Sequence, residues 1–251
     1  MKKYLEVFSG TYEDILQKIE ESIKNKNKLF IVPMSPPLVT IALRDKQFCK
    51  IVCRADIRTP DGIGMIWASK LFGRNVKERI TGANLTMRLA KLATNKKWKL
   101  FFLGAAPGVA GKAKGKLLEK YKALQIKIYS PPFGKFSQEE NKKIIKMINN
   151  FKTNILFVAF GAPKQEKWIA KHKSYLNAQV FLPVGGTFDF IAGDINRAPE
   201  VIQKFGLEWL HRICIQPRRL LRLPDALMFF PHVAKEFILD KILKQSDCDC
   251  C

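Results

Sequence analysis

Short apolar runs alternate with helical patterns along most of the chain, and the segments that connect them are short. Several apolar runs have the length of buried strands: residues 29–32, 99–103, 126–129, 154–160 and 180–184. Between them, apolar residues such as Ile15, Ile19 and Ile23 recur every four positions, which indicates helices. A strand followed by a helix and another strand places the two strands parallel. The alternation therefore predicts an α/β fold around a parallel sheet.

The alternation stops near residue 195. Up to that point it runs through residues 1–95 and is repeated more clearly over residues 96–195, which together we expect to form the α/β core. Tryptophan, arginine and proline then cluster over residues 196–251 without a strand pattern, which indicates a C-terminal helical appendage. Residues 58–65 stand ahead of a helical pattern and are interpreted as a loop.

The chain carries a formal net charge of +22, supplied mostly by lysine. Such a field favours anionic partners, namely nucleotide phosphates, anionic lipid surfaces or nucleic acid. A basic nucleic-acid-binding protein is one alternative, and it predicts basic residues interleaved with exposed aromatic residues. The lysines instead follow the spacing of helix surfaces, and no motif of a nucleic-acid-binding module occurs. We therefore expect no nucleic acid among the partners.

The sequence predicts a cytoplasmic protein without a metal or another cofactor. No apolar run reaches the roughly 18 residues that a membrane-spanning helix needs, and the first residues lack the apolar stretch of a signal peptide. The three histidines are too scattered to suggest a metal site. The only Asp-x-Asp pattern, Asp247-Cys248-Asp249, lies in the C-terminal tail.

Three strand-to-helix turns in the second half carry glycine where a predicted strand ends. They contain Gly104, Gly161 and the pair Gly185 and Gly186. Backbone N–H groups at a helix N-terminus can bind an anion, and parallel sheets bind ligands at the carboxyl ends of their strands. The turn after Gly104 matches neither a P-loop nor a dinucleotide-binding motif, so a packing role alone is an equal alternative there.

Polar residues follow two of these turns. Lys164 and Gln165 open a predicted helix after the second turn, and Asp189 follows the glycine pair. Such groups can hydrogen-bond a sugar, a phosphate or a ribose. The alternatives are structural: a surface helix with solvated Lys164 and Glu166, and Asp189 as a helix cap.

In the first half, Asp61 lies in the loop before a helix and Arg79 stands beside a glycine turn. A helix cap is the alternative role for an isolated aspartate of this kind. In the appendage, Arg212, Arg219 and Arg222 are spaced by seven and three residues, so they share one face if the helix is continuous. Three guanidinium groups on one face can bind a diphosphate, and a solvated or lipid-facing basic stripe is the alternative.

Taken in order, these segments resemble the WecG/TagA/CpsF glycosyltransferases of bacterial envelope polysaccharide synthesis. The resemblance covers roughly residues 29–222. It is carried by residues 60–64 (PDGIG), 79–82 (RITG), 160–166 (FGAPKQE), 185–189 (GGTFD), 197–199 (RAP) and 206–210 (GLEWL), followed by Arg212, Pro217, Arg219 and Arg222.

The resemblance implies a core of two Rossmann-like halves, about residues 1–95 and 96–195. It also implies a metal-independent, inverting glycosyltransferase that uses a UDP-sugar, N-acetylmannosamine or a related hexose. The implied acceptor is N-acetylglucosamine on undecaprenyl diphosphate, at the inner face of the cell membrane, in polysaccharide or teichoic acid synthesis. The appendage would then associate peripherally with an anionic membrane surface, and a homo-oligomer is compatible with this expectation.

The resemblance also assigns roles to individual residues. Asp61 matches the proposed general base. Residues expected to bind the sugar or the acceptor diphosphate are Ser35, Arg79, Gln165, Arg212, Arg219 and Arg222. Residues expected to bind the nucleotide are Gly104, Gly161, Lys164, Gly185, Gly186 and Asp189.

One segment departs from the family pattern. Members usually carry Thr-x-Asn after the first core strand, where this chain has Pro33-Met34-Ser35. Proline has no N–H to donate, and serine reaches less far than asparagine. The departure leaves the donor sugar open. It also makes a catalytically inactive scaffold, which binds a sugar nucleotide or a lipid, the second alternative.

Overall fold

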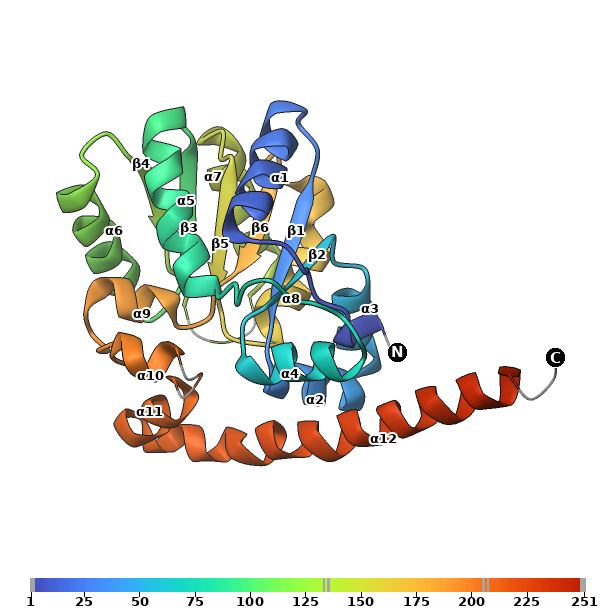
Figure 1. The fold of residues 1–251 in the computed structure, drawn as a ribbon. Helices are drawn as coiled ribbons and strands as arrows, with labels where there is room; N and C mark the ends of the chain where they lie inside the picture. Colours follow the sequence, from blue (N-terminus) through green and yellow to red (C-terminus); the bar gives the residue numbers. More distant parts are fainter. Residues whose placement is uncertain (1–2, 133, 135, 205, 207, 249–251) are drawn as a thin grey trace.

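The computed structural model describes residues 3–132, 134, 136–204, 206 and 208–248, without the side chains of 200, 204, 212, 218, 219, 222 and 243–248. Its strands form one parallel sheet in the order β2-β1-β6-β5-β3-β4 (Figure 1). The strands are β1 (Leu29–Met34), β2 (Ile57–Pro60), β3 (Lys99–Gly104), β4 (Gln125–Tyr129), β5 (Ile155–Ala159) and β6 (Val180–Pro183).

The predicted α/β class is confirmed, and the sheet is continuous. The structure shows one sheet and does not set off two halves: the strands of residues 1–95 and 96–195 join where β1 pairs with β6, since Leu29 is opposite Val180 and Phe30 is opposite Phe181. The interpretation of residues 58–65 as a loop is wrong at its start, because β2 pairs with β1 along its whole length. This strand has only four residues, among them an arginine and a proline, and so forms no apolar run.

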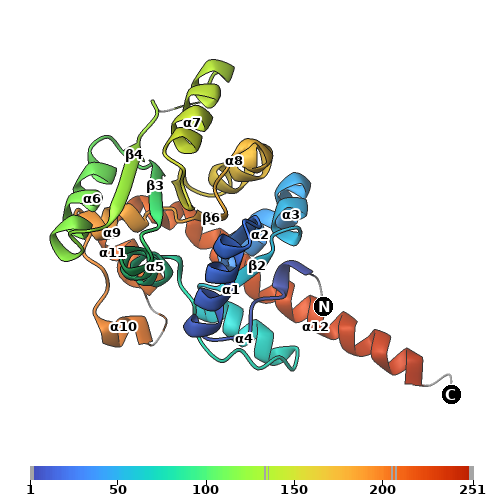
Figure 2. The same cartoon turned by 90° about the horizontal axis from the view of Figure 1, so that it is seen from above.

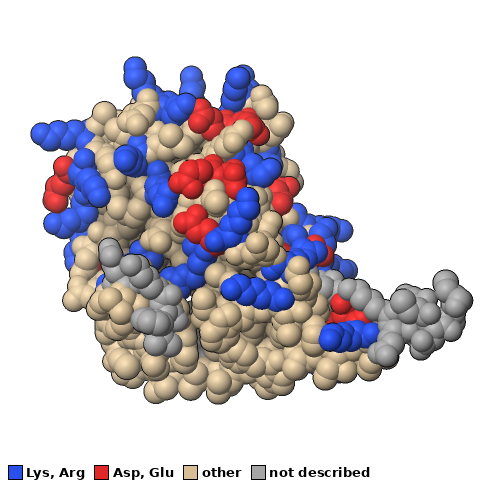
Figure 3. Space-filling model, in the orientation of Figure 1, with Lys and Arg blue, Asp and Glu red and all other residues tan. Residues whose placement is uncertain are grey.

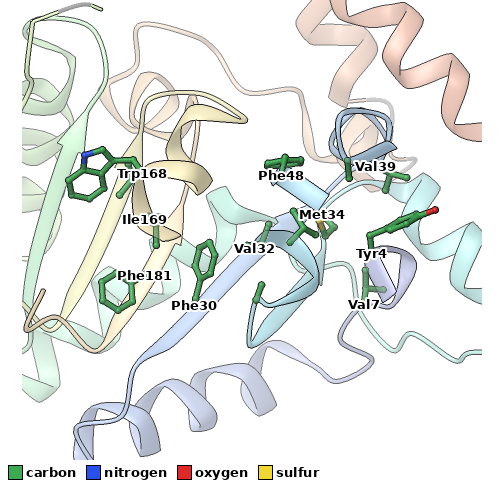
Figure 4. Packing of buried hydrophobic residues seen from close by; sticks show 14 of the residues in the cluster. Tyr4, Val7, Phe30, Val32, Met34, Val39, Phe48, Trp168, Ile169 and Phe181 are labelled. Carbon is green, nitrogen blue, oxygen red and sulfur yellow. The ribbon is translucent and has the colours of Figure 1, made fainter. Parts of the chain in front are cut away.

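Apolar residues alternate between the two faces of the sheet. In β3, Phe101 and Leu103 belong to one buried cluster and Leu100 and Phe102 to the other. Such a strand is buried on both faces and reads as a continuous apolar run. Figure 4 shows the first cluster, in which Phe30 on β1 lies near helix residues such as Ile169.

Helices cover both faces of the sheet, as Figure 2 shows. The first cluster includes residues of α2 (Pro36–Arg44), α3 (Lys46–Cys53), α4 (Ile63–Leu71), α7 (Gln138–Asn150) and α8 (Lys164–His172). The second includes residues of α1 (Tyr12–Lys24), α5 (Gly82–Lys96), α6 (Val109–Lys120) and α9 (Thr187–Ala192). The result is a three-layer α/β core.

The C-terminal region is helical, as predicted, but its helix is not continuous across Pro217. It consists of α10 (Glu200–Lys204), α11 (Glu208–Ile215), the 3₁₀ helix η3 (Pro217–Arg222) and α12 (Leu223–Cys248). The break matters because Arg212 belongs to α11 whereas Arg219 and Arg222 belong to η3. The condition under which their spacing would place them on one helical face is therefore not met.

The helix α12 packs on the core before it extends past it (Figure 1). Phe229 is only 1% exposed and belongs to the first core cluster. Thr40 Oγ1 donates a hydrogen bond to the Asp225 carbonyl at 2.6 Å, and Arg44 forms an ion pair with the Asp225 carboxylate at 2.6 Å. A buried phenylalanine side chain contributes about 2 kcal/mol, so this half of α12 is part of the folded unit.

The outer side of α12 is apolar. Large exposed side chains of η3 and α12 include Leu220, Leu221, Leu227, Met228, Phe230, Ile238 and Ile242. In Figure 3 the described residues of the lower band are mostly uncharged on the face shown, while lysine and arginine are frequent above it. None of the described helices has the length and apolarity that would let it cross a bilayer.

Candidate active site

The loops that follow the carboxyl ends of the strands surround a cavity of about 1770 Å³. It is lined by every residue that the sequence analysis assigned to a site and whose side chain is described: Ser35, Asp61, Arg79, Gly104, Gly161, Lys164, Gln165, Gly185, Gly186 and Asp189. The side chains of Arg212, Arg219 and Arg222 lie outside the described part of the chain. The roles assigned to all these residues stay predictions.

Asp61 stands directly after β2, at the end of its strand. Its backbone N–H donates to the Met34 carbonyl at 2.9 Å, which joins it to the end of β1, and its Oδ1 accepts from the Gly82 N–H at 3.3 Å. The next residue must be glycine, because a Cβ on Gly62 would lie 2.8 Å from the ring of Pro36. Backbone contacts therefore hold this carboxylate at the cavity wall.

Gly62 is the N-cap residue of α4, the helix that follows Asp61, while the Asp61 carboxylate accepts from Gly82, the first residue of α5. Thr81 caps α5 by accepting from the Asn84 N–H at 3.2 Å, and its own N–H donates to the Tyr12 hydroxyl at 2.9 Å. Arg79 precedes this cap and is half-buried at the cavity. It forms no hydrogen bond or ion pair with any residue described by the structure. Its guanidinium group is thus available to an anionic ligand.

The ends of β5 and β6 are joined by one side chain. Gln165 Oε1 accepts from the Gly161 N–H at 3.2 Å and from the Gly185 N–H at 3.0 Å. Both glycines have positive φ, +77° and +52°, a region that other residues rarely adopt. Gln165 was expected to bind the sugar. The structure shows its amide oxygen occupied by two backbone donors.

Glu166 is the site residue whose environment the sequence did not reveal. It lines the cavity yet is only 1% exposed, so the structural alternative that described it as solvated is wrong for Glu166, while Lys164 is exposed as in that alternative. Its Oε1 accepts from Gln165 Nε2 at 2.9 Å, and its Oε2 has no hydrogen-bond partner among the described residues. Burial raises the pKa of Glu166 from 4.5 to about 7.

This shifted pKa makes the stability of the protein depend on pH. Between pH 4.5 and 7 the unfolded chain has released the proton that folded Glu166 still binds, so the free energy of unfolding falls as pH rises. We expect Glu166→Gln to remove this loss, which amounts to about 3 kcal/mol. Urea denaturation of both proteins at pH 4 and pH 8 measures it. If the free energies of unfolding of the two proteins differ by the same amount at both pH values, Glu166 ionises at its ordinary pKa.

A polar contact ties the appendage to the wall of the cavity. Arg197 Nη1 donates to Asn84 Oδ1 at 2.5 Å, and its Nε pairs with Glu208 Oε1 at 3.4 Å. Asn84 belongs to the first turn of α5, the same turn whose Gly82 N–H binds Asp61. Arg197 therefore links the start of α11 to the helix turn that holds the candidate base.

Apolar side chains from three elements also line the cavity. They are Trp67 of α4, Trp209 of α11, and Leu227 and Phe230 of α12, and all four are exposed; Trp67 is 56% exposed. We call these four residues the apolar rim. They come from distant parts of the chain, and no local pattern indicated that they would meet. The cavity thus joins polar strand ends to an apolar surface.

Comparisons with known proteins agree with this geometry. The model of the "Glycosyl transferase WecG/TagA/CpsF family" matches residues 4–242. Two relatives are named N-acetylglucosaminyldiphosphoundecaprenol N-acetyl-beta-D-mannosaminyltransferase. The one from Staphylococcus aureus is 30% identical over 212 residues, which are 84% of this chain and 82% of the relative. The one from Bacillus spizizenii is 31% identical over 224 residues, 88% and 86% of the two chains. With its motifs in order and the family model spanning nearly all of it, this chain belongs to the WecG/TagA/CpsF family of glycosyltransferases.

Proposed function

We propose that this chain transfers N-acetylmannosamine, with inversion, from a UDP-sugar to N-acetylglucosamine carried on undecaprenyl diphosphate. The observation that carries the proposal is the composition of one cavity. Asp61, the glycine-bearing ends of β3, β5 and β6 and the apolar rim all line it. The names of the relatives, which specify the sugar and the lipid-linked acceptor, agree with this combination.

The glycine-bearing strand ends support a nucleotide at the sheet edge. Gly161, Gly185 and Gly186 leave the backbone open to close approach, and ligands of parallel sheets bind at this edge. Asp189, in the first turn of α9, lines the same part of the cavity. It is our candidate acceptor for a hydroxyl group of the ribose.

The proposed reaction needs a general base and cationic groups that stabilise the negative charge developing on the leaving UDP. The acceptor hydroxyl attacks C1 of the donor sugar while Asp61 takes its proton. The bond between C1 and the diphosphate oxygen breaks, and UDP leaves with the electron pair. Arg79 and Lys164 are the cationic cavity residues that we assign to the developing negative charge. The appendage arginines stay our candidates for the acceptor diphosphate.

We expect the transfer to be independent of divalent metal ions. Many transferases place a metal between the carboxylates of an Asp-x-Asp pair at a strand end, whereas the only such pattern here is in the tail. Turnover should therefore persist in excess EDTA and change little with added magnesium or manganese. Activity that disappears in chelator and returns with one divalent ion would contradict the assignment of arginine and lysine to the leaving group.

The apolar surface supports a lipid-linked acceptor. Trp67, Trp209 and Phe230 are exposed beside the cavity, and the apolar outer side of α12 continues from them. Basic and apolar side chains together favour binding in the interface of an anionic membrane. We therefore place the protein at the inner face of the cell membrane as a peripheral protein, with its cavity open toward the lipid.

A panel of UDP-sugars tests the proposal against a soluble analogue of the acceptor, N-acetylglucosamine diphosphate on a short alkyl chain. We expect the fastest release of UDP with UDP-N-acetylmannosamine, and a product of inverted anomeric configuration. Preference for another UDP-sugar would make that sugar the donor. The Pro33-Met34-Ser35 segment, which departs from the family pattern, would then be the candidate cause of the changed specificity. Binding of UDP without turnover of any donor would favour the inactive scaffold.

A further inference from the structure

The amide of Gln165 has its orientation imposed by its surroundings. Its Oε1 lies between the N–H groups of Gly161 and Gly185, and both can only donate. The amide nitrogen must therefore point the other way, toward an acceptor. In this buried position the acceptor is Glu166 Oε1, 2.9 Å from Gln165 Nε2.

We propose that Glu166 is a positioning residue for the donor nucleotide, which acts by fixing the Gln165 amide and thereby the separation of the loops after β5 and β6. This inference rests on the proposed function, in which those two loops hold the donor. Neither residue needs to touch the substrate for this role. We call the pair of side chains, with the two glycine N–H groups, the clasp.

The chemistry of the clasp explains why a carboxyl group is buried there. A side chain such as leucine fills similar space without the cost of burying a carboxyl group, but it leaves the Gln165 N–H unpaired. An unpaired amide could rotate and present its nitrogen to the two glycine N–H groups, which would push the loops apart. The raised pKa of Glu166 agrees with a group held for its hydrogen bond rather than for its charge.

The two loops face the cavity that would receive the nucleotide. Gly161 and Gly185 both line it, and Gly186 leads into α9, where Asp189 stands. A shift of one loop relative to the other would move the backbone that approaches the diphosphate. The clasp should therefore govern donor affinity and leave the acceptor and the base unaffected.

A double-mutant cycle in the full-length protein tests this coupling. Glu166→Leu removes the acceptor of one hydrogen bond, whereas Gln165→Met removes that bond and both bonds from the glycine N–H groups. We expect Glu166→Leu to weaken UDP binding in calorimetry about tenfold, the effect of one lost buried hydrogen bond, and Gln165→Met to weaken it at least as much. The double variant should bind no more weakly than Gln165→Met, because Glu166 acts only through Gln165.

Kinetics separate positioning from general destabilisation. Glu166→Leu should raise KM for the UDP-sugar while kcat and KM for the acceptor change less than about threefold, whereas partial unfolding lowers kcat without altering KM. Glu166→Gln, whose amide oxygen accepts the same bond, should restore donor affinity to within about threefold. Glu140→Leu is the matched control, because Glu140 accepts a hydrogen bond from the Tyr129 hydroxyl at 2.5 Å but does not line the cavity.

Three results would overturn the inference. They are unchanged UDP affinity in folded Glu166→Leu, losses in the double variant that multiply those of the single variants, and a Glu166→Gln protein as weak as Glu166→Leu. If Glu166→Leu does not fold, Gln165→Met and Glu166→Gln decide together: Gln165→Met should bind UDP about tenfold or more weakly while Glu166→Gln stays within about threefold of wild type, and equal affinity of the two variants would overturn the inference. Wild-type protein that binds no uridine nucleotide would overturn the proposed function as well, whereas normal wild-type binding with insensitive variants overturns the clasp alone.

Discussion

Replacing Asp61 by asparagine is expected to lower kcat about 100- to 10,000-fold, the usual contribution of a general base. Asparagine keeps the shape of the side chain and an oxygen that can accept from the Gly82 N–H, so the wall of the cavity should persist. It cannot take a proton from the acceptor hydroxyl. Steady-state transfer with the soluble acceptor, together with calorimetric UDP binding, measures both consequences; UDP affinity should change less than about threefold.

Asp56→Asn is the matched control for this experiment. Asp56 accepts from the Phe30 N–H at 2.7 Å at the other end of β2 and does not line the cavity, so its loss should cost stability rather than turnover. A near-normal kcat of the Asp61→Asn protein would show that Asp61 is not the general base. A lowered Tm with full activity would identify it as a structural residue only.

The second large effect is expected at the apolar rim. The double substitution Leu227→Glu and Phe230→Glu places two carboxylates where we propose that the protein meets the lipid. Carboxylates are repelled by anionic headgroups and are costly to bury in hydrocarbon. Transfer to undecaprenyl-linked acceptor in anionic vesicles should fall about tenfold or more. Transfer to the short-chain soluble acceptor should stay within about threefold, since Asp61 and the nucleotide loops are untouched.

The effect should be specific to this surface. Tyr175 is 67% exposed and precedes β6, so it lies toward the amino ends of the strands, whereas the cavity lies at their carboxyl ends. Tyr175→Glu should therefore leave both vesicle sedimentation and transfer unchanged. If the rim variant loses transfer to the soluble and the lipid-linked acceptor equally, the rim shapes the catalytic site itself. If it loses neither, the lipid enters elsewhere.

Local patterns in the sequence were sufficient for the α/β class. Apolar runs such as residues 154–160 and 180–184 became β5 and β6, because strands buried on both faces must be apolar throughout. The glycine-bearing strand ends were recognisable for a similar reason, since glycine at a strand end allows positive φ and close approach. Parallel strands have their carboxyl ends at one edge, so these turns had to lie near one another.

Other features were absent from any local pattern. β2 has four residues and includes Arg58 and Pro60, and it is a strand because β1 supplies its hydrogen-bonding partner. The pairing of β1 with β6 joins segments about 150 residues apart, so no local sequence pattern predicts it. Pro217 itself indicated that the helix is interrupted there. The spacing of the three arginines, taken alone, predicted that they share one face.

The sequence by itself determined the periodicities, the glycine positions and the ordered motifs, because each depends on residues that are near neighbours in the chain. Only the tertiary structure decided that Glu166 is buried against Gln165, that Phe229 completes the core, and that the apolar rim opens beside Asp61. The physical reason is that burial, and with it the pKa of a carboxyl group, depends on which distant segments pack around a side chain. The same glutamate on the same helix would be solvated if no distant segments covered it.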